Sequence, residues 1–291
     1  MSKKIKSLCA LICTAVLMFS LCLPASAGYL EGADIQEMPY EAFDETPMYA
    51  NGEYIGDALK LGSISYAPIP DFCEKLLHCN VTLYWDKDTT TLSVSCPDVT
   101  LVFDLHYNYL CVNDRYIYLE EGLFNVDGVL YIPIRALAKA FAANVNWNAE
   151  DGSIDISYTP GRLIESGVGY YNEYELYWLS HVIYAESGNQ SMEGMIGVGN
   201  VVLNRARDGS GIFPNDVRGV IFQENQFSVV DNGTIFCDPK PHCIVAAKLC
   251  LEGYNTVGDS LFFLNPSISN SYWFDTYRTF YASIGDHAFY A

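Results

Sequence analysis

The chain of 291 residues has few basic residues: 16 Lys and Arg stand against 35 Asp and Glu, which gives a formal net charge of −19. Nucleic-acid binding requires clustered cations to neutralise phosphates, and so does electrostatic attachment to a membrane surface. We therefore expect no nucleic-acid partner and no polybasic membrane contact. Half of the residues are apolar and only 18% are charged, so the chain can build packed cores, and its length suits two domains.

Long apolar runs are confined to the start of the chain. Three lysines precede an almost unbroken apolar stretch at 8–23, and small residues follow it at 25–27. This stretch is short for a membrane span, and the small residues suit a signal peptidase. We interpret residues 1–27 as a cleaved signal peptide, with a retained membrane anchor as the alternative. The mature chain is then expected to be secreted or held in the cell wall, with no stable membrane span.

Seven cysteines remain once residues 1–27 are removed, and an oxidising compartment favours pairing among them. Cys73 with Cys79 and Cys237 with Cys243 are close enough in sequence to form disulfides. The odd number leaves at least one thiol unpaired, and the spacing leaves the connectivity open.

Basic residues are absent from positions 28–59, whereas acidic residues are frequent there. Pro39 and Pro47 interrupt any regular periodicity in this stretch. We therefore predict an acidic tether over residues 28–49, with the first folded domain beginning at residue 50.

An internal repeat follows the tether. The sequence YAPIPDF at 66–72 is echoed by YIPIRAL at 131–137, and residues 81–94 are echoed by 145–157. Each unit is typical of a strand, a short helix started by proline, and a hairpin whose tip is rich in Asp, Asn or Gly.

Over residues 50–158 this repeat resembles the copper amine oxidase N-terminal domain, a stalk-like module of exported proteins. The resemblance implies an accessory or spacing module through which the chain can associate with the cell wall. It does not imply copper, because His78 and His106 lie in separate segments without ligand spacing. We therefore expect neither a metal nor another cofactor.

Residues 159–171 are predicted to be a linker to a second domain over 172–291. Early in that domain Leu179, Ile183 and Glu186 fall at three- and four-residue steps, which places them on one stripe of a helix. The sequence Ser-Gly-Asn directly after Glu186 favours the end of that helix.

Glu186 thus lies both on a core-facing stripe and in a last helical turn. Partial desolvation and the negative end of the helix dipole each favour the protonated carboxyl group. A carboxyl group that keeps its proton near neutral pH is what a general acid for glycosidic cleavage requires. The competing interpretation is a solvated charge at the end of an amphipathic helix.

A second helix is expected over Ser191–Arg205 although it contains several glycines. Glycine lowers helix propensity, so another interaction must favour it at these positions. We expect a close approach to the neighbouring helix.

Several short motifs then follow in a fixed order. They are Ala185-Glu186, Leu203-Asn204-Arg205, Phe213-Pro214, Gln226-Phe227-Ser228, Asn265-Pro266 and Gly285-Asp286-His287-Ala288-Phe289. In this order they resemble the catalytic domain of the SleB-like cell wall hydrolases, the family of spore cortex-lytic enzymes. The resemblance covers about residues 173–291 and implies a mainly helical domain of the lysozyme or transglycosylase type. The whole chain is therefore predicted to be α+β.

The resemblance implies that Glu186 is the catalytic acid/base of a lytic transglycosylase acting on the glycan strands of peptidoglycan. The family commonly has a second Glu where Gln190 stands, which puts an auxiliary carboxylate in doubt. Aromatic, amide and hydroxyl groups are typical of sugar sites. The candidate substrate contacts are Tyr184, Gln190, Gln226, Ser228 and Tyr272. Asn204, Arg205 and His287 are candidates for structural support.

A single carboxylate suffices if the substrate supplies the nucleophile. Ordinary glycosidases use two carboxylates, and we interpret the other acidic residues of this domain, Asp231 among them, as solvated surface charges. A hydrolytic muramidase remains an alternative. A zinc amidase using Cys237, His242, Cys243 and Cys250 is a second alternative, and a non-catalytic wall-binding protein is a third.

Overall fold

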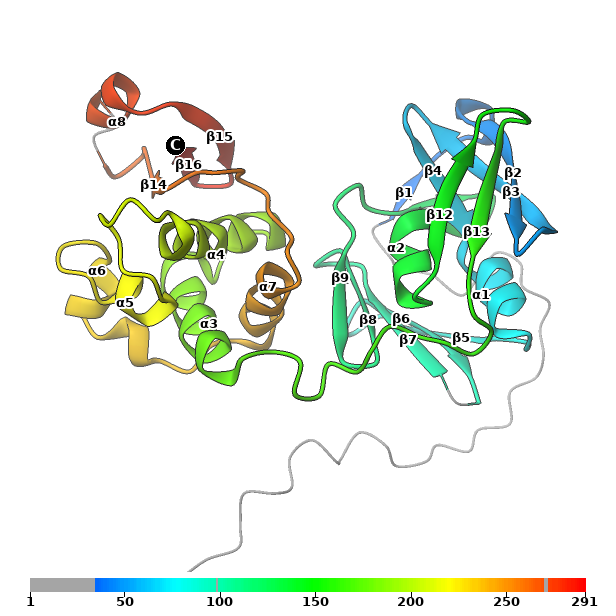
Figure 1. The fold of residues 1–291 in the computed structure, drawn as a ribbon, viewed down its shortest axis with the longest axis horizontal. Helices are drawn as coiled ribbons and strands as arrows, with labels where there is room; N and C mark the ends of the chain where they lie inside the picture. Colours follow the sequence, from blue (N-terminus) through cyan, green and yellow to red (C-terminus); the bar gives the residue numbers. More distant parts are fainter. Residues whose placement is uncertain (1–34, 98, 270–271) are drawn as a thin grey trace, which may run out of the picture.

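The computed structural model describes residues 35–97, 99–269 and 272–291, and the predicted signal peptide lies outside them. The chain forms two lobes: a β-rich amino-terminal domain and a mainly helical carboxy-terminal domain (Figure 1). The architecture is α+β, as predicted. Among the described residues, no helix combines the length and apolar character needed to cross a bilayer.

The amino-terminal domain contains two sheets. The larger has eight strands in the order β1-β10-β11-β4-β3-β2-β13-β12, and the smaller has five in the order β5-β6-β7-β8-β9. Its elements are β1 (Gln36–Glu37), η1 (Tyr40–Ala42), β2 (Asp44–Ala50), β3 (Glu53–Leu61), β4 (Ile64–Pro68), α1 (Ile69–Leu77), β5 (Thr82–Asp86), β6 (Thr91–Cys96), β7 (Val99–Asp104), β8 (Tyr109–Val112), β9 (Arg115–Tyr118), β10 (Phe124–Val126), β11 (Val129–Pro133), α2 (Ile134–Ala140), β12 (Asn144–Asn148) and β13 (Ser153–Ser157).

The predicted repeat is confirmed, but its two copies separate in space. Each copy consists of a strand, a short helix with proline next to its start, and a hairpin: β4, α1 and β5–β6 in the first, β11, α2 and β12–β13 in the second. The strands β4 and β11 pair with each other. The first hairpin then enters the five-stranded sheet, whereas the second enters the eight-stranded sheet. Apolar residues from both copies share one core.

The tether predicted over residues 28–49 is wrong for its described part. Strand β1 pairs in parallel with β10, and β2 lies inside the larger sheet between β3 and β13. Pro47 does not break β2, because β13 pairs only with Met48–Ala50, beyond the proline. Alternate side chains of the strand are buried, and Met48 is wholly inside the core.

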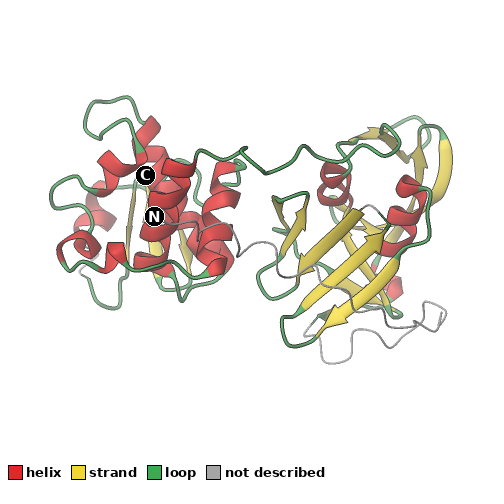
Figure 2. Cartoon of the chain, turned by 90° about the horizontal axis from the view of Figure 1, so that it is seen from below, coloured by secondary structure: helices red, strands yellow, loops and turns green. Residues whose placement is uncertain are grey.

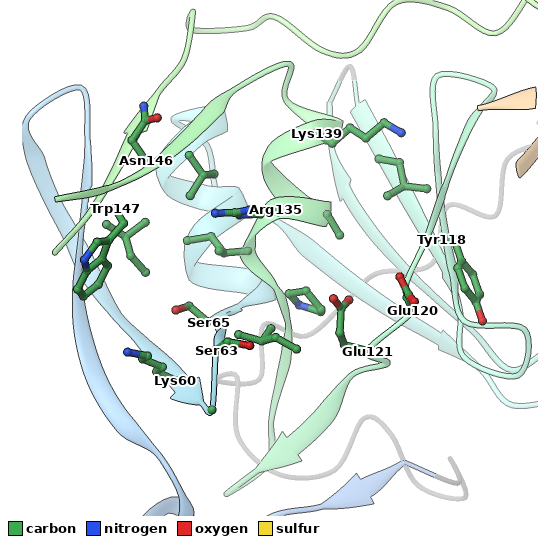
Figure 3. A pocket seen from close by; sticks show the side chains of 18 of the residues that line it. Lys60, Ser63, Ser65, Tyr118, Glu120, Glu121, Arg135, Lys139, Asn146 and Trp147 are labelled. Atoms are coloured by element: carbon green, nitrogen blue, oxygen red, sulfur yellow. The ribbon is translucent and has the colours of Figure 1, made fainter. Parts of the chain in front are cut away.

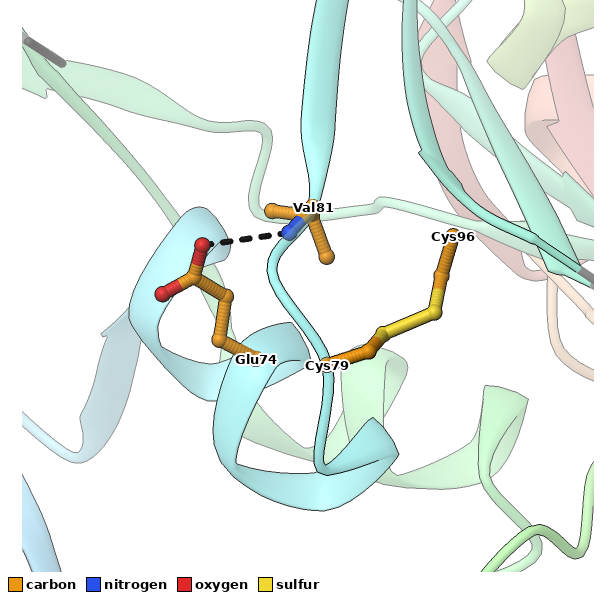
Figure 4. Close-up of a disulfide and its surroundings, with 4 residues drawn as sticks. All are labelled: Glu74, Cys79, Val81 and Cys96. Atoms are coloured by element: carbon orange, nitrogen blue, oxygen red, sulfur yellow. Dashed lines mark hydrogen bonds between the residues drawn. A yellow bond between two sulfur atoms is a disulfide. The ribbon is translucent and has the colours of Figure 1, made fainter.

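A disulfide joins Cys79 to Cys96, so both pairings considered from sequence proximity are wrong (Figure 4). Cys79 follows α1, and the β5–β6 hairpin returns the end of β6 to the same place. Glu74 of α1 accepts a hydrogen bond from the backbone N–H of Val81, which holds the intervening segment against the helix. Cys73 is a free buried thiol.

The predicted linker has no regular secondary structure but is attached to the amino-terminal domain. The N–H of Ile164 donates to the carbonyl of Ala140, and the N–H of Gly167 donates to that of Asn113. The linker then leads to Asn172, whose side chain caps the next helix by accepting from two backbone N–H groups.

The carboxy-terminal domain packs its helices around α4 and adds a three-stranded sheet, in the order β14-β16-β15, at its far side. Its elements are α3 (Glu173–Ser187), α4 (Met192–Arg207), α5 (Val217–Ile221), α6 (Ser228–Asp231), η2 (Thr234–Phe236), α7 (Pro241–Leu251), β14 (Phe262–Leu264), α8 (Tyr272–Tyr277), β15 (Phe280–Ile284) and β16 (His287–Tyr290). The first two helices agree with those expected from the sequence.

The glycines of α4 permit close helix packing, as expected. A Cβ atom built on Gly199 would lie 2.6 Å from Sγ of Cys250 in α7 and 2.9 Å from Cδ1 of Ile183 in α3. Any larger residue would push these helices apart. Because Ile183 lies one turn before Glu186, this contact also fixes the end of α3 that carries Glu186.

The two domains meet where β9 faces α7 (Figures 1 and 2). Arg115 of β9 makes a two-pronged ion pair with Glu252, the residue that caps α7, and Tyr171 donates a hydrogen bond of 2.8 Å to the same carboxylate. Burial opposes ionisation of Glu252, but these two hydrogen bonds and the charges of Arg115 and Lys139 outweigh it and hold its pKa below the ordinary value. The domains are therefore joined by a buried, charged network.

Candidate active site

A cleft of about 650 Å³ opens in the carboxy-terminal domain, and we call it the Glu186 cleft. Its walls come from the turn between α3 and α4, the segment 225–231, β14 with the turn that follows it, and the turn between β15 and β16. Six of the residues singled out from the sequence line it. They are Glu186, Gln190, Arg205, Gln226, Ser228 and His287.

Glu186 is the next-to-last residue of α3, and its helix ends where the sequence predicted. Among the described residues, no side chain or backbone group hydrogen bonds to its carboxyl group or pairs with it. Desolvation raises the pKa of this carboxyl group to about 6. The shift has the direction expected from the sequence. It leaves about a tenth of Glu186 protonated at pH 7, with a proton that it can donate into the cleft, and a larger share in mildly acidic conditions.

Gln190 has its amide group committed to the opposite wall. Its Nε2 donates 2.8 Å to Oδ2 of Asp286 and its Oε1 accepts from the backbone N–H of Asp286 at 3.1 Å. Gly285 precedes this contact with a positive φ of 55°, and a Cβ atom there would collide with Oε1 of Gln190. Gln190 therefore ties the β15–β16 turn to the α3–α4 turn, and the cleft wall depends on this closure.

Gln226 and Ser228 offer free polar groups to the cleft. Both are exposed: Gln226 lies two residues before α6, and Ser228 is its first residue. Neither side chain bonds to another described residue. The amide and hydroxyl groups are thus available to a bound molecule.

Arg205 lies deep in the cleft and is only 6% exposed. Its Nε donates 2.7 Å to the carbonyl of Leu261, and the guanidinium lies over the rings of Phe213, Phe227 and Phe262. Desolvation lowers its pKa to about 10. Its Nη1 is buried without a partner among the described residues.

His287 is also buried in the wall, with its ring edge against Phe263. Burial lowers the pKa of the imidazole below its ordinary value, against the opposing effect of Asp286. Its Nδ1 has no hydrogen-bond partner among the described residues. At neutral pH the ring is therefore neutral.

Three of the residues predicted from the sequence do not line the cleft. Tyr184 packs among the apolar residues between the helices, and Tyr272 lies on α8 with most of its surface exposed. Asn204 donates to the carbonyls of Gly258 and Ser260, so it braces the chain that leads into β14.

Asp231 was not anticipated at this site. The sequence predicts a solvated surface charge at this position. Asp231 is indeed exposed, but it is also the last residue of α6 and lines the Glu186 cleft. Asp286 and Asn265 also line the cleft. Asn265 and Asp286 belong to motifs noted in the sequence, but no local signal assigns any of the three residues to a common site, because the segments that carry them are joined only by the fold.

The ligands considered for a zinc amidase do not gather. Cys243 and Cys250 are buried within α7, whereas Cys237 is exposed. His242 donates to the carbonyl of Gly188 at 3.2 Å and accepts from the hydroxyl of Tyr107 at 3.0 Å. Across residues 35–97, 99–269 and 272–291, no three His, Cys, Asp or Glu side chains converge as metal ligands do. This arrangement gives the zinc alternative no support.

Two family models match the chain. Residues 189–290 match the Cell Wall Hydrolase family, and residues 61–156 match the Copper amine oxidase N-terminal domain. The carboxy-terminal domain is a SleB-like cell wall hydrolase domain. The amino-terminal domain is of the copper amine oxidase N-terminal type. Glu186 lies three residues before the stretch that the hydrolase model matches.

The chain is also similar to individual proteins. The chain is 30% identical over 135 residues to a spore cortex-lytic enzyme of Oceanobacillus iheyensis, covering 46% of this chain and 47% of that one. It is 32% identical over 119 residues to a spore cortex-lytic enzyme of Bacillus cereus, covering 41% of this chain and 45% of that one. The chain thus spans about half the length of these relatives.

A solved structure shares the region of the hydrolase domain. It is the catalytic domain of the germination-specific lytic transglycosylase SleB from Bacillus anthracis, with 31% sequence identity, a TM-score of 0.38, and coverage of 42% of this chain and 97% of that one. The sequence identities to the enzymes of Oceanobacillus iheyensis and Bacillus cereus make the chain a homologue of spore cortex-lytic enzymes.

Proposed function

We propose that this protein is an exported lytic transglycosylase that cleaves the glycosidic bond between N-acetylmuramic acid and N-acetylglucosamine in peptidoglycan. The observation that carries the proposal is the carboxyl group of Glu186, which lies in an open cleft with no protein partner and has a pKa raised to about 6. The hydrolase family match supports peptidoglycan as the substrate. Relatives described as spore cortex-lytic enzymes support an extracytoplasmic location.

The proposed reaction uses Glu186 twice. Its carboxyl group first donates its proton to the leaving glycosidic oxygen as the bond from C1 of the muramic residue to that oxygen breaks. The resulting carboxylate then takes the proton of the C6 hydroxyl of the same sugar, whose oxygen forms a bond to C1. The products are a new 4-hydroxyl end and a 1,6-anhydro end, and Glu186 is again protonated. Because the nucleophile belongs to the substrate, its proximity replaces a second catalytic carboxylate.

Release of soluble fragments from purified peptidoglycan tests the proposed activity. The full chain is expected to solubilise muropeptides from spore cortex or from vegetative walls, and supplying both materials separates these two targets. An absence of released glycan fragments from both would contradict the proposal and favour a non-catalytic wall-binding protein.

Asp231 favours a hydrolytic muramidase as the second candidate, because it is a second carboxylate in the Glu186 cleft. Glycosidases that deliver water use two carboxylates on either side of the bond, and removing either one strongly lowers the rate. In the transglycosylase reaction Asp231 has no proton to transfer.

We expect Asp231→Asn to retain cleavage within about threefold of the unchanged chain, since the amide keeps the shape of the cleft and loses only a charge. The measurement is the initial rate of muropeptide release. A loss of roughly a hundredfold or more would instead assign Asp231 a catalytic role and favour the muramidase.

A further inference from the structure

A second hollow, of about 790 Å³, lies in the amino-terminal domain at its border with the hydrolase domain. We call it the Trp147 pocket. The turn between β3 and β4, helix α2 and strand β12 form its walls, and Tyr254 of the hydrolase domain completes it. Figure 3 shows Trp147 and Lys60 at one end and Tyr118 with Glu120 at the other. No role has been assigned to this hollow so far.

Trp147 forms an exposed aromatic platform. Trp147 is 52% exposed, although tryptophan residues are usually mostly buried. The ammonium group of Lys60 lies 5.3 Å from the ring centroid and holds the indole in place. The ring stands on β12, the last strand of the larger sheet. Ser63 of the turn between β3 and β4 and Ser65 of strand β4 line the same pocket. An oriented aromatic ring with hydroxyl groups in the same pocket is typical of a surface that stacks sugar rings.

The same end of the pocket is cationic in a strongly acidic chain. Lys60 and Arg135 point into it, and neither forms an ion pair with any described carboxylate. Lys139 is turned away toward Tyr254 and Glu252. Glu120 and Glu121 line the opposite end. The pocket therefore carries opposite charges at the two ends of a largely apolar lining, and an acidic group on a ligand would lie at the end with Trp147.

An interdomain groove of about 580 Å³ lies between the Trp147 pocket and the Glu186 cleft and adjoins both. Tyr118 and Glu120 line both the Trp147 pocket and this groove. Asn189 and Gln190 line both the groove and the Glu186 cleft. Three adjoining hollows thus run from the exposed indole to the catalytic candidate, a path suited to a polymer rather than to a small molecule.

We propose that the Trp147 pocket is a distal binding site for the glycan strand that the hydrolase domain cuts. An N-acetylated sugar ring stacks on Trp147, and its polar substituents bond to Ser63 and Ser65. A carboxylate lies against Lys60 and Arg135: that of the stem peptide in an intact strand, or the lactyl carboxylate of muramic acid where the peptide has been removed. The choice of peptidoglycan as the strand rests on the proposed function. The amino-terminal domain then acts as a substrate-holding domain and not only as a spacer.

Binding of the full chain to insoluble peptidoglycan tests this site. All variants carry Glu186→Gln, so that the strand stays intact and binding is measured independently of cleavage. The test variant adds Lys60→Ala with Trp147→Ala. The matched control adds Tyr84→Ala with Lys87→Ala, which removes an exposed aromatic and an exposed lysine from the other sheet. Thermal unfolding of each variant verifies that both domains remain folded.

We expect the Lys60 and Trp147 substitutions to weaken binding by roughly tenfold, the loss of one stacked ring and one charge-assisted contact. The control pair should leave binding unchanged.

Competition with soluble probes identifies the ligand: glycan strands with stem peptides and strands stripped of peptides should both compete, and neutral chitin oligosaccharides should compete more weakly. Equal binding by test and control variants would overturn the site. Complete competition by free stem peptides, or equal competition by chitin oligosaccharides, would overturn the assignment to an acidic glycan.

Discussion

Glu186→Gln is expected to lower the rate of peptidoglycan cleavage by roughly a hundredfold to ten-thousandfold, the range that a positioned general acid contributes. Glutamine keeps the size and hydrogen-bonding shape of the side chain but can neither donate the proton to the leaving oxygen nor accept one afterwards. The measurement is the initial rate of fragment release at a fixed enzyme concentration. Glu173→Gln supplies the matched control, since it changes an exposed glutamate at the start of the same helix that lines neither the Glu186 cleft nor the interdomain groove.

The pH dependence of the same rate follows from the pKa of about 6 for Glu186. Only the protonated carboxyl group can act as the acid, so kcat/KM should fall above about pH 6 and approach a tenfold loss for each further pH unit. The Glu186→Gln variant should lose this alkaline limb. A limb that persists unchanged in its residual activity would assign the titration to another group.

Stability separates a catalytic loss from a folding defect. The pKa of Glu186 is raised in the folded state from 4.5 to about 6. Ionisation of this carboxyl group therefore destabilises the folded chain, and the loss of stability develops as the pH rises through this interval. Glutamine carries no such cost. The variant should therefore be more stable than the unchanged chain above pH 7, by on the order of 2 kcal/mol, and equally stable below about pH 4.

Arg115→Met is expected to destabilise the docked arrangement of the two domains by roughly 3–5 kcal/mol, the cost of leaving one partner of a buried ion pair uncompensated. The side chain of Glu252 is only 1% exposed and would keep its charge without its main partner. Because the domains are joined by a chain segment, they can separate to hydrate this carboxylate. The measurement is chemical unfolding of the full chain together with its radius of gyration in solution.

The double variant Arg115→Met with Glu252→Gln is the control for the ion pair. It removes both charges, so it should recover most of the lost stability. The pKa of Glu252 is lower in the folded chain than in the unfolded chain. Ionised Glu252 therefore stabilises the fold above the unfolded pKa, and this stabilisation is lost as the pH falls through the folded pKa. The deficit of Arg115→Met should therefore shrink under acidic conditions. A deficit independent of pH, or no recovery in the double variant, would contradict the assigned role of the pair.

Local signals in the sequence were sufficient to predict the helix that carries Glu186. Its apolar periodicity and the residues that end it are all contained within a short segment, and α3 ends where predicted. The repeat was predictable for the same reason, because strand, helix and hairpin signals recur in one order. The prediction failed at Pro47, because we took proline to exclude a strand. Pro47 does lie in strand β2, but it precedes the residues of β2 that pair with β13.

The parts of the site that could not be predicted depend on contacts between distant segments. Gln190 meets Asp286 across 96 positions of sequence, and no spacing rule links them. Asp231 reaches the cleft only because α6 packs beside α3. The disulfide shows the same limit, since Cys96 reaches Cys79 through the return of a hairpin and not through proximity along the chain.

The origin of the oxygen at the new glycan end tests the central claim most directly. Peptidoglycan is digested by the full chain in water enriched in heavy oxygen, and the mass of each released fragment is measured. If Glu186 directs attack by the C6 hydroxyl of the sugar, every new muramic end is lighter by one water than a hydrolysed end and carries no label. Labelled reducing ends would show that water is the nucleophile and would contradict the single-carboxylate transglycosylase.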